Sequence, residues 1–155
     1  MKLSALGIAA IVSGIVAGPA YAGPYTDDFS KCLVAQATPQ DRAILVQWIF
    51  SAVSAGPTVR ELAKITPQQR TELTTQASSL FSRLMTQSCR APLVTALKYE
   101  GTSVIETGFG VLGQVAMRDL MTQPEVQQQL NALNNNQDKD AFAAIAKEAG
   151  IAPPK

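Results

Sequence analysis

Apolar residues recur every three to four positions through most of the chain, as they do on one face of an α-helix. No segment alternates apolar and polar residues with the period of two that a half-buried strand shows. The pattern predicts an all-α fold, a compact helical bundle of about six to seven helices. The expected helices lie after Thr26, from Pro39 to Ser54, around Val59–Ala63, from Pro67 to Ser88, around Leu93–Leu97, from Thr102 to Met121, from Pro124 through Leu133, and from Asp138 to Ala149.

Two segments carry the same signal for the start of a helix. Thr38–Asp41 places a threonine before a proline and an acid three residues on, and Thr66–Gln69 repeats the arrangement with a glutamine in the last position. The threonine side chain can cap the helix, the proline suits its first position, and the third residue can bond back to the cap. Because the residues that follow diverge at once, we attribute the similarity to shared helix-start chemistry rather than to a repeat.

The segment Ala43–Val53 is apolar nearly all round, with only a narrow polar stripe made of Gln47, Ser51 and the following Ser54. A helix of this kind is typical of the centre of a domain. We therefore expect Trp48 and Phe50 to be core anchors. The alternative is that their face is an exposed anchor for a partner, because large aromatic residues dominate binding hot spots.

The last expected helix carries Phe142, Ile145 and Ala149 on one face and ends at Gly150. We expect this face to be buried in the common core. Residues 23–155 number 133, which is close to the usual size of one domain. The sequence thus predicts a single helical domain over residues 23–152 and a frayed tail at residues 153–155.

The first 22 residues have the features of a cleaved signal peptide. Lys2 precedes an uncharged, mostly apolar run, Gly18 and Pro19 break that run, and Ala20-Tyr21-Ala22 offers small residues for cleavage. A membrane anchor is the alternative, but the run is shorter than the roughly 20 apolar residues that span a bilayer. We expect cleavage after Ala22, a periplasmic or secreted product, and no membrane insertion afterwards.

Cys32 and Cys89 are the only cysteines, and in an oxidising compartment such a pair most simply forms a disulfide. A redox pair is the weaker alternative, because redox cysteines are usually separated by two residues. Metal binding is weaker still, since the chain has no histidine to complete a ligand set. The sequence predicts no metal and no cofactor.

Without its first 22 residues the chain has 12 basic and 12 acidic residues, which are scattered along its length. This balance argues against a nucleic-acid-binding protein, which needs clustered lysine and arginine. The absence of histidine removes the commonest general base. Carboxylate pairs such as Glu100 with Glu106, or Asp27 with Asp28, could in principle do acid–base chemistry, but acids near helix starts are normally solvated. We therefore expect a protein that is not an enzyme.

Three glycines, Gly108, Gly110 and Gly113, match the spacing of a dinucleotide-binding turn. That turn needs a strand on each side of the helix that follows, and this chain has helical signals instead. We interpret Gly110 and Gly113 as a small-residue face that lets another helix approach closely. Gly108 would mark a kink, a break or a hinge.

The segment Ile65-Thr66-Pro67-Gln68-Gln69 resembles the Leu-Thr-x-x-Gln motif of the Spy and CpxP-like periplasmic chaperones, with isoleucine in place of the leucine. The match covers these five residues. The run Asp27–Val34, together with Leu45–Phe50, resembles exported bacterial all-helical proteins that have no assigned activity. The predicted architecture, a small exported helical protein with one long-range disulfide, is also similar to that of the HdeA-type acid-stress chaperones.

Two hypotheses of function follow. The first is a non-enzymatic exported protein that binds another protein of the cell envelope, for example as an immunity protein or inhibitor. The second, which the resemblance to the chaperones implies, is an envelope-stress chaperone that binds unfolded clients through exposed apolar surface. The sequence leaves the oligomeric state open.

Overall fold

The structure, a computed structural model, describes residues 23–151. The predicted signal peptide and the predicted tail at residues 153–155 lie outside these residues. The elements in chain order are α1 (Pro24–Gln36), α2 (Pro39–Val53), the 3₁₀ turn η1 (Arg60–Leu62), α3 (Pro67–Arg83), the π-helical turn η2 (Leu84–Ser88), α4 (Arg90–Glu100), α5 (Ser103–Met121), α6 (Pro124–Asn135) and α7 (Lys139–Glu148). The predicted all-α fold is confirmed, and residues 23–151 contain no strand.

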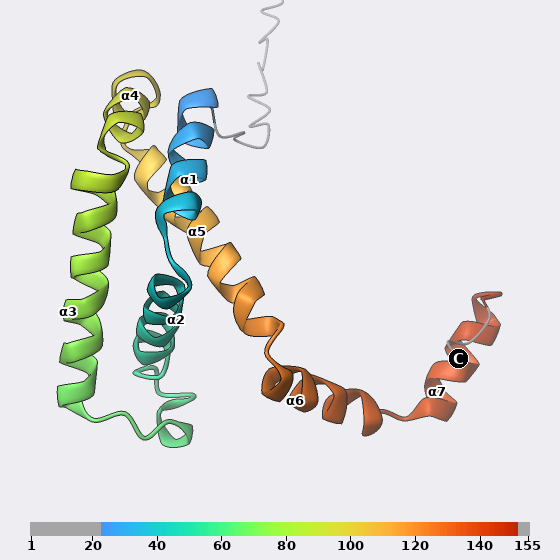
Figure 1. Cartoon of the computed structure of the whole chain (residues 1–155). Helices are drawn as coiled ribbons and strands as arrows, with labels where there is room; N and C mark the ends of the chain where they lie inside the picture. Colours follow the sequence, from blue (N-terminus) through green and yellow to red (C-terminus); the bar gives the residue numbers. More distant parts are fainter. Residues whose placement is uncertain (1–22, 152–155) are drawn as a thin grey trace, which may run out of the picture.

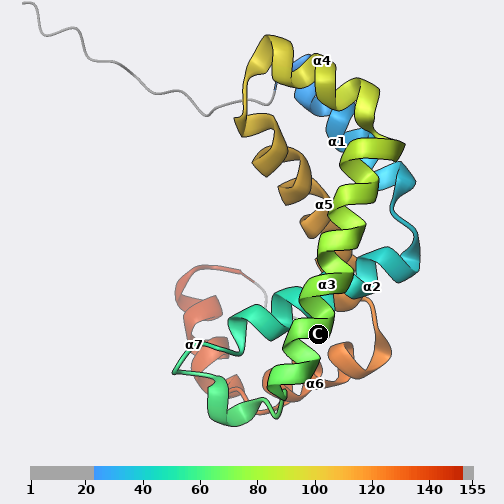
Figure 2. The same cartoon turned by 90° about the vertical axis from the view of Figure 1, so that its left-hand side faces the viewer.

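Helix α5 is the helix that connects the parts of the bundle, because it packs against both α1 and α2 (Figure 1). Helix α1 lies between α4 and α5, and α2 lies between α3 and α5. The long helix α3 runs beside α2, as the two views in Figures 1 and 2 both show. The arrangement has two ends, one made by α1 and α4 and the other by α2 and α3, and α5 joins them.

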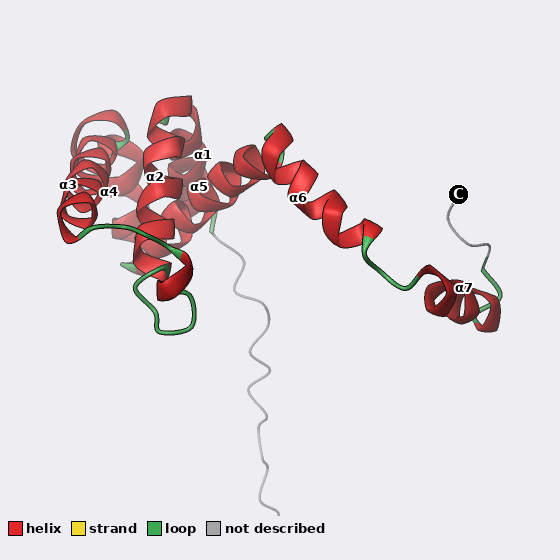
Figure 3. Cartoon of the chain, turned by 90° about the horizontal axis from the view of Figure 1, so that it is seen from below, coloured by secondary structure: helices red, strands yellow, loops and turns green. Residues whose placement is uncertain are grey.

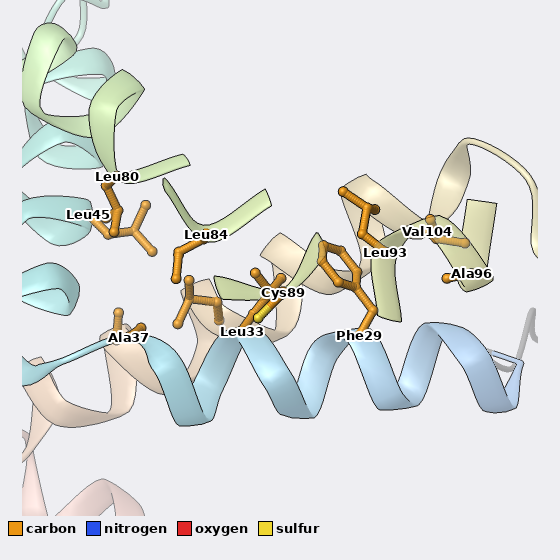
Figure 4. Packing of buried hydrophobic residues seen from close by; sticks show 12 residues of the cluster. Phe29, Leu33, Ala37, Leu45, Leu80, Leu84, Cys89, Leu93, Ala96 and Val104 are labelled. Atoms are coloured by element: carbon orange, nitrogen blue, oxygen red, sulfur yellow. The ribbon is translucent and has the colours of Figure 1, made fainter. Parts of the chain in front are cut away.

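The hydrophobic core follows the inner face of α1 (Figure 4). Phe29 and Leu33 on this face are fully buried. The remaining buried residues of the cluster come from the end of α1 and from the other elements of the bundle, namely Ala37, Leu45, Leu80, Leu84, Cys89, Leu93, Ala96, Val104, Leu112 and Ala116. The core thus runs from the inner face of α1 to the contact between α2 and α3.

Both predicted helix starts with threonine caps are confirmed. The Asp41 backbone N–H donates to the Thr38 hydroxyl over 3.2 Å, and the Asp41 carboxylate accepts from the Thr38 backbone N–H at 2.8 Å. Thr66 and Gln69 make the same reciprocal pair at 3.2 and 2.8 Å. Each pair satisfies backbone donors that the first turn of a helix otherwise leaves free.

Helix α1 begins at Pro24, earlier than the prediction of a start after Thr26. No side chain of its own segment caps it. Instead the Glu100 carboxylate, from the end of α4, accepts hydrogen bonds from the backbone N–H groups of Tyr25 and Thr26. A cap supplied by a distant residue leaves no local signal, and this explains the error.

The predicted long helix from Pro67 to Ser88 is present as α3 followed by η2. In η2 the Cys89 backbone N–H bonds to the Leu84 carbonyl at 2.8 Å, which is the wider turn of a π-helix. Both of these residues are completely buried. The wide turn therefore ends α3 within the core and leads directly into α4.

Helices α6 and α7 extend away from the bundle (Figures 1 and 3). Helix α6 packs only against α5, and α7 packs against none of the other described helices. The prediction that the last helix buries Phe142, Ile145 and Ala149 is wrong: all three are exposed, and only the small Ala146 is buried on α7. The capping signals were correct, since Asp138 caps α7 and Gly150, with a φ of 69°, follows its end.

Candidate functional site

Cys32 and Cys89 form the predicted disulfide, with their Cα atoms 5.9 Å apart. Cys32 lies on α1, and Cys89 is the residue just before α4. The bond cross-links two elements that already pack together in the core. Since neither cysteine is free, the disulfide is a structural element of the bundle.

The two aromatic residues predicted as core anchors have different environments. Trp48 is partly buried against the core, and its ring meets the Phe81 ring edge-on with centroids 5.7 Å apart. Phe50 is 58% exposed and borders a shallow groove that it shares with Ile65 and Leu73. The core-anchor prediction holds for Trp48 and is wrong for Phe50.

Helix α2 is half-exposed rather than central, and of its predicted polar stripe Gln47 is exposed whereas the two serines face inward. Ser51 and Ser54 are buried, the Ser54 hydroxyl donates to the Ser51 carbonyl at 2.9 Å, and the Arg70 guanidinium donates to the same carbonyl. Phe50 and Val53 are turned outward instead. The hydrogen bonds at the end of α2 explain this orientation, because buried serines and a helix-end carbonyl need partners that α3 supplies.

The three glycines lie within the continuous helix α5, so the predicted break or hinge at Gly108 is wrong. Gly108 is a close-packing site: a Cβ atom there would lie 2.7 Å from the Phe29 ring. Gly110 and Gly113 have open space where a Cβ atom would be, and their predicted close approach to another helix is also wrong.

One acidic residue of each pair considered for acid–base chemistry has a structural partner. Asp27 forms an ion pair with Lys31 at 2.6 Å on the surface of α1. Glu100 accepts from the Thr26 hydroxyl at 2.5 Å and from two backbone N–H groups of α1. The Thr26 hydroxyl bond, opposed in part by burial and reinforced by the backbone bonds, holds the pKa of Glu100 below its usual value. Glu100 therefore acts as a charged helix cap.

Exposed apolar side chains lie on both helices of the C-terminal arm, which we define as α6 and α7 (residues 124–148). On α6, Val126, Leu130 and Leu133 recur at helical spacing, and Leu133 is 65% exposed. On α7, Phe142 is 56% exposed and Ile145 is 60% exposed. Each helix thus presents an apolar stripe with exposed side chains, and of the α6 stripe only Val126 is partly buried.

A groove of about 340 Å³ lies at the base of this arm, between the start of α2 and the end of α5. One wall carries an ion pair in which the Arg42 guanidinium contacts the Asp119 carboxylate at 2.5 Å. Arg42 also donates to the Ala37 carbonyl at 2.6 Å, so its side chain is held in place. Val46 and Leu120 supply apolar lining. The groove and the arm are adjacent because α6 follows α5 after a turn of two residues.

Sequence analysis missed the exposure of the arm, although one signal was available. The segment from Pro124 to Asn135 has three large apolar residues and six glutamine or asparagine residues. Lys139–Glu148 has only two large apolar residues, Phe142 and Ile145. The spacing of the apolar residues shows which face of each helix is apolar. Their small number indicates that neither helix could bury much apolar surface.

Among residues 23–151, no helix is long and apolar enough to cross a bilayer. The same part of the chain has no cluster of three or more acidic or cysteine residues placed to hold a metal ion. Comparison of the chain with protein-family models, with curated proteins and with solved structures finds no match.

Proposed function

We propose that this protein is a non-enzymatic binding protein, exported to the periplasm or the medium, and that its C-terminal arm is the element that binds another protein of the cell envelope. An inhibitor or immunity protein would work in this way. The bundle of α1 to α5 would be the stable scaffold, and the arm would be the part that reaches the partner.

The observation that carries the proposal is the uncovered apolar stripe of the arm. Apolar side chains at i, i+4 and i+7, as on α6, are the arrangement with which a helix enters an apolar groove on another protein, and Leu130 and Leu133 of this set are exposed. Isolated exposed apolar residues are common, but contiguous stripes on two successive helices are typical of an interaction surface. Binding would remove Leu133, Phe142 and Ile145 from water.

The charge of α6 favours a protein partner over a lipid surface. Between Asp119 and Asp138 the only charged residue is Glu125. Helices that lie on anionic membranes carry lysine and arginine on their polar face, and α6 has none. The amide side chains that flank its stripe can be desolvated against another protein when they are hydrogen-bonded, and depletion of charge is typical of the centre of a protein interface.

The test compares two full-length variants that add one charge to α6. Leu133→Asp introduces the charge on the apolar stripe, and Gln128→Asp introduces it on the opposite face, two residues from Val126. Each protein is used to isolate partners from an envelope extract, and the ratio of partner to bait is measured. We expect one partner at fixed stoichiometry, lost with Leu133→Asp and retained with Gln128→Asp.

Equal partner binding by both variants would overturn the assignment of the arm as the binding element. Light scattering of the purified protein tests whether the partner is a second copy of the chain. A dimer that Leu133→Asp dissociates, in the absence of any other partner, would replace the proposed envelope partner by self-association.

The alternative is the envelope-stress chaperone, and a separate observation favours it. Phe50, Val53 and Leu62, which is 84% exposed, present further apolar surface at the α2 end of the bundle. Several apolar sites on one molecule suit the weak binding of many unfolded clients. A chaperone would suppress aggregation of an unrelated unfolded protein, and neither Leu133→Asp nor Phe50→Ser alone would abolish this activity. A specific binder would show no suppression.

A further inference from the structure

The Glu100 carboxylate lies at the amino end of α1 and approaches the first described residue, Gly23. Its two oxygens accept from the backbone N–H groups of Tyr25 at 3.0 Å and Thr26 at 2.9 Å and from the Thr26 hydroxyl. The stacked rings of Tyr25 and Tyr99, 4.9 Å apart, join the same two helices beside it. The end of α4 and the start of α1 thus form a fixed contact around one negative charge.

Any residue other than glycine at position 23 would require the Glu100 side chain to move. A Cβ atom on Gly23 would overlap the Glu100 carboxylate, because it would lie 2.7 Å from Oε2 and closer still to Oε1. Since the nitrogen and the Cβ position of one residue are separated by about 2.5 Å, the Gly23 nitrogen lies within about 5 Å of the carboxylate. An amino group at this nitrogen would be in reach of a salt bridge.

The sequence places the expected cleavage site at this same residue. Ala20-Tyr21-Ala22 has the small residues that signal peptidases require, and Gly23 follows directly. Hydrolysis of the Ala22–Gly23 amide adds water, leaving a carboxylate on Ala22 and an amine on Gly23. At neutral pH this amine is largely protonated.

We propose that proteolytic processing occurs between Ala22 and Gly23 and that the new α-ammonium group of Gly23 pairs with the Glu100 carboxylate, so that maturation stabilises the fold. The inference does not depend on the identity of any partner. Glu100 thus has two roles, since it caps α1 in the precursor and also binds the mature amino terminus after cleavage.

Electrostatics explains why such a partner is needed. A positive charge at the start of a helix is unfavourable, because the free N–H groups there carry partial positive charge. The Glu100 carboxylate offsets both the charge of the Gly23 ammonium group and the partial positive charge of these N–H groups. The other charged groups on the two helices at this end are Asp27, Asp28 and Lys31 on α1 and Lys98 on α4. Asp27 and Lys31 pair with one another, and Lys98 lies over the Tyr99 ring at 5.2 Å.

The experiment compares the mature chain with a free Gly23 amine and the same chain acetylated at that amine. Acetylation removes the charge and keeps the rest of the chain. We expect it to increase the equilibrium constant for unfolding up to about fivefold, the range of an exposed ion pair. In the Glu100→Gln background acetylation should have much less effect. Glu106→Gln, which removes an exposed acid at the start of α5, is the matched control and should behave like the parent.

Two further measurements keep the proposal falsifiable if Glu100→Gln does not fold. The intact mass of the exported protein should correspond to a chain that starts at Gly23, and a different start would overturn the proposal. The pKa of the Gly23 amine in the parent, followed by NMR, should lie above the usual range of a chain terminus. An unshifted pKa, or an equal effect of acetylation in the parent and in Glu100→Gln, would exclude the salt bridge.

Discussion

At the scale of single residues, chemically identical positions differ because of what surrounds them. Gly108 and Gly110 are two residues apart on α5, yet only Gly108 meets another helix, at the buried Phe29 ring. The sequence shows the glycines but not which face of the helix each one occupies. That information comes from the packing of α1 on α5, and for this reason the spacing alone assigned Gly110 and Gly113 wrongly.

The first prediction uses this pair. Gly108→Ala should destabilise the fold by about 1–3 kcal/mol, because the added methyl group must displace a ring that the core holds fixed. Gly110→Ala should stabilise it by up to about 1 kcal/mol through the higher helix propensity of alanine. Denaturant unfolding of both variants measures the difference. Equal effects would show that α1 does not pack on Gly108.

The second prediction concerns pH and Asp41. Burial tends to raise the pKa of this residue, but hydrogen bonds from Thr38 and the Arg83 guanidinium at 2.8 Å more than offset it, so the pKa lies below the usual 3.8. A lowered pKa stabilises the fold above about pH 3.8, and this contribution is lost as the pH falls through the folded-state value.

We therefore expect Asp41→Asn to lower the free energy of unfolding by about 1 kcal/mol at pH 7. The difference from the parent should shrink steadily below pH 3.8. Asp28→Asn, at an exposed position on α1, is the matched control. A difference that stays constant down to pH 2 would show that the Asp41 charge does not contribute.

At the scale of elements, starts and ends of helices were more predictable than their burial. Thr38, Thr66 and Asp138 cap helices through neighbours in sequence, so the sequence contains the whole interaction. The start of α1 and the orientation of α2 depend on Glu100 and Arg70, which belong to other helices. Interactions between distant segments leave no pattern in the local sequence. The predictions therefore failed at the positions that depend on such interactions.

The third prediction concerns the stability of the arm helices. A helix of 10 residues without tertiary packing is marginal in water, since most helix stability in proteins comes from packing. We expect amide hydrogens in the last two turns of α7 to exchange within seconds at neutral pH, while those around Leu112 in α5 are protected to the limit of global unfolding. Hydrogen exchange followed by mass spectrometry measures both.

Binding of a partner should reduce this difference in hydrogen exchange between α7 and α5. If the arm binds a partner as proposed, α7 gains packing and its amides should become protected in the complex, with Leu112 unaffected. Protection of α7 in the free protein equal to that of α5 would show that the arm packs on the bundle in solution.

At the scale of the whole molecule, the disulfide joins α1 to the start of α4 and so closes a long loop of the chain. Cys32 and Cys89 are 57 residues apart, and cross-linking them restricts the unfolded chain. In the chain-entropy model this stabilises the fold by roughly 4 kcal/mol. We expect Cys32→Ser to lower the unfolding midpoint without reductant and to match the parent in reductant. An unchanged midpoint without reductant would show that the bond adds no stability.

The same bond decides how the molecule comes apart when its chain is cut. Residues 32–89 form a closed ring that contains α2, η1 and α3, and η1 has no buried residue. A protease that cleaves beside Arg60 or Lys64 opens this ring, and both pieces stay joined until a reductant is added. Cleavage beside Lys139 lies outside the ring and releases α7 permanently. The bundle of α1 to α5 thus stays in one covalent piece after a cut within the ring, whereas a single cut beside Lys139 removes α7.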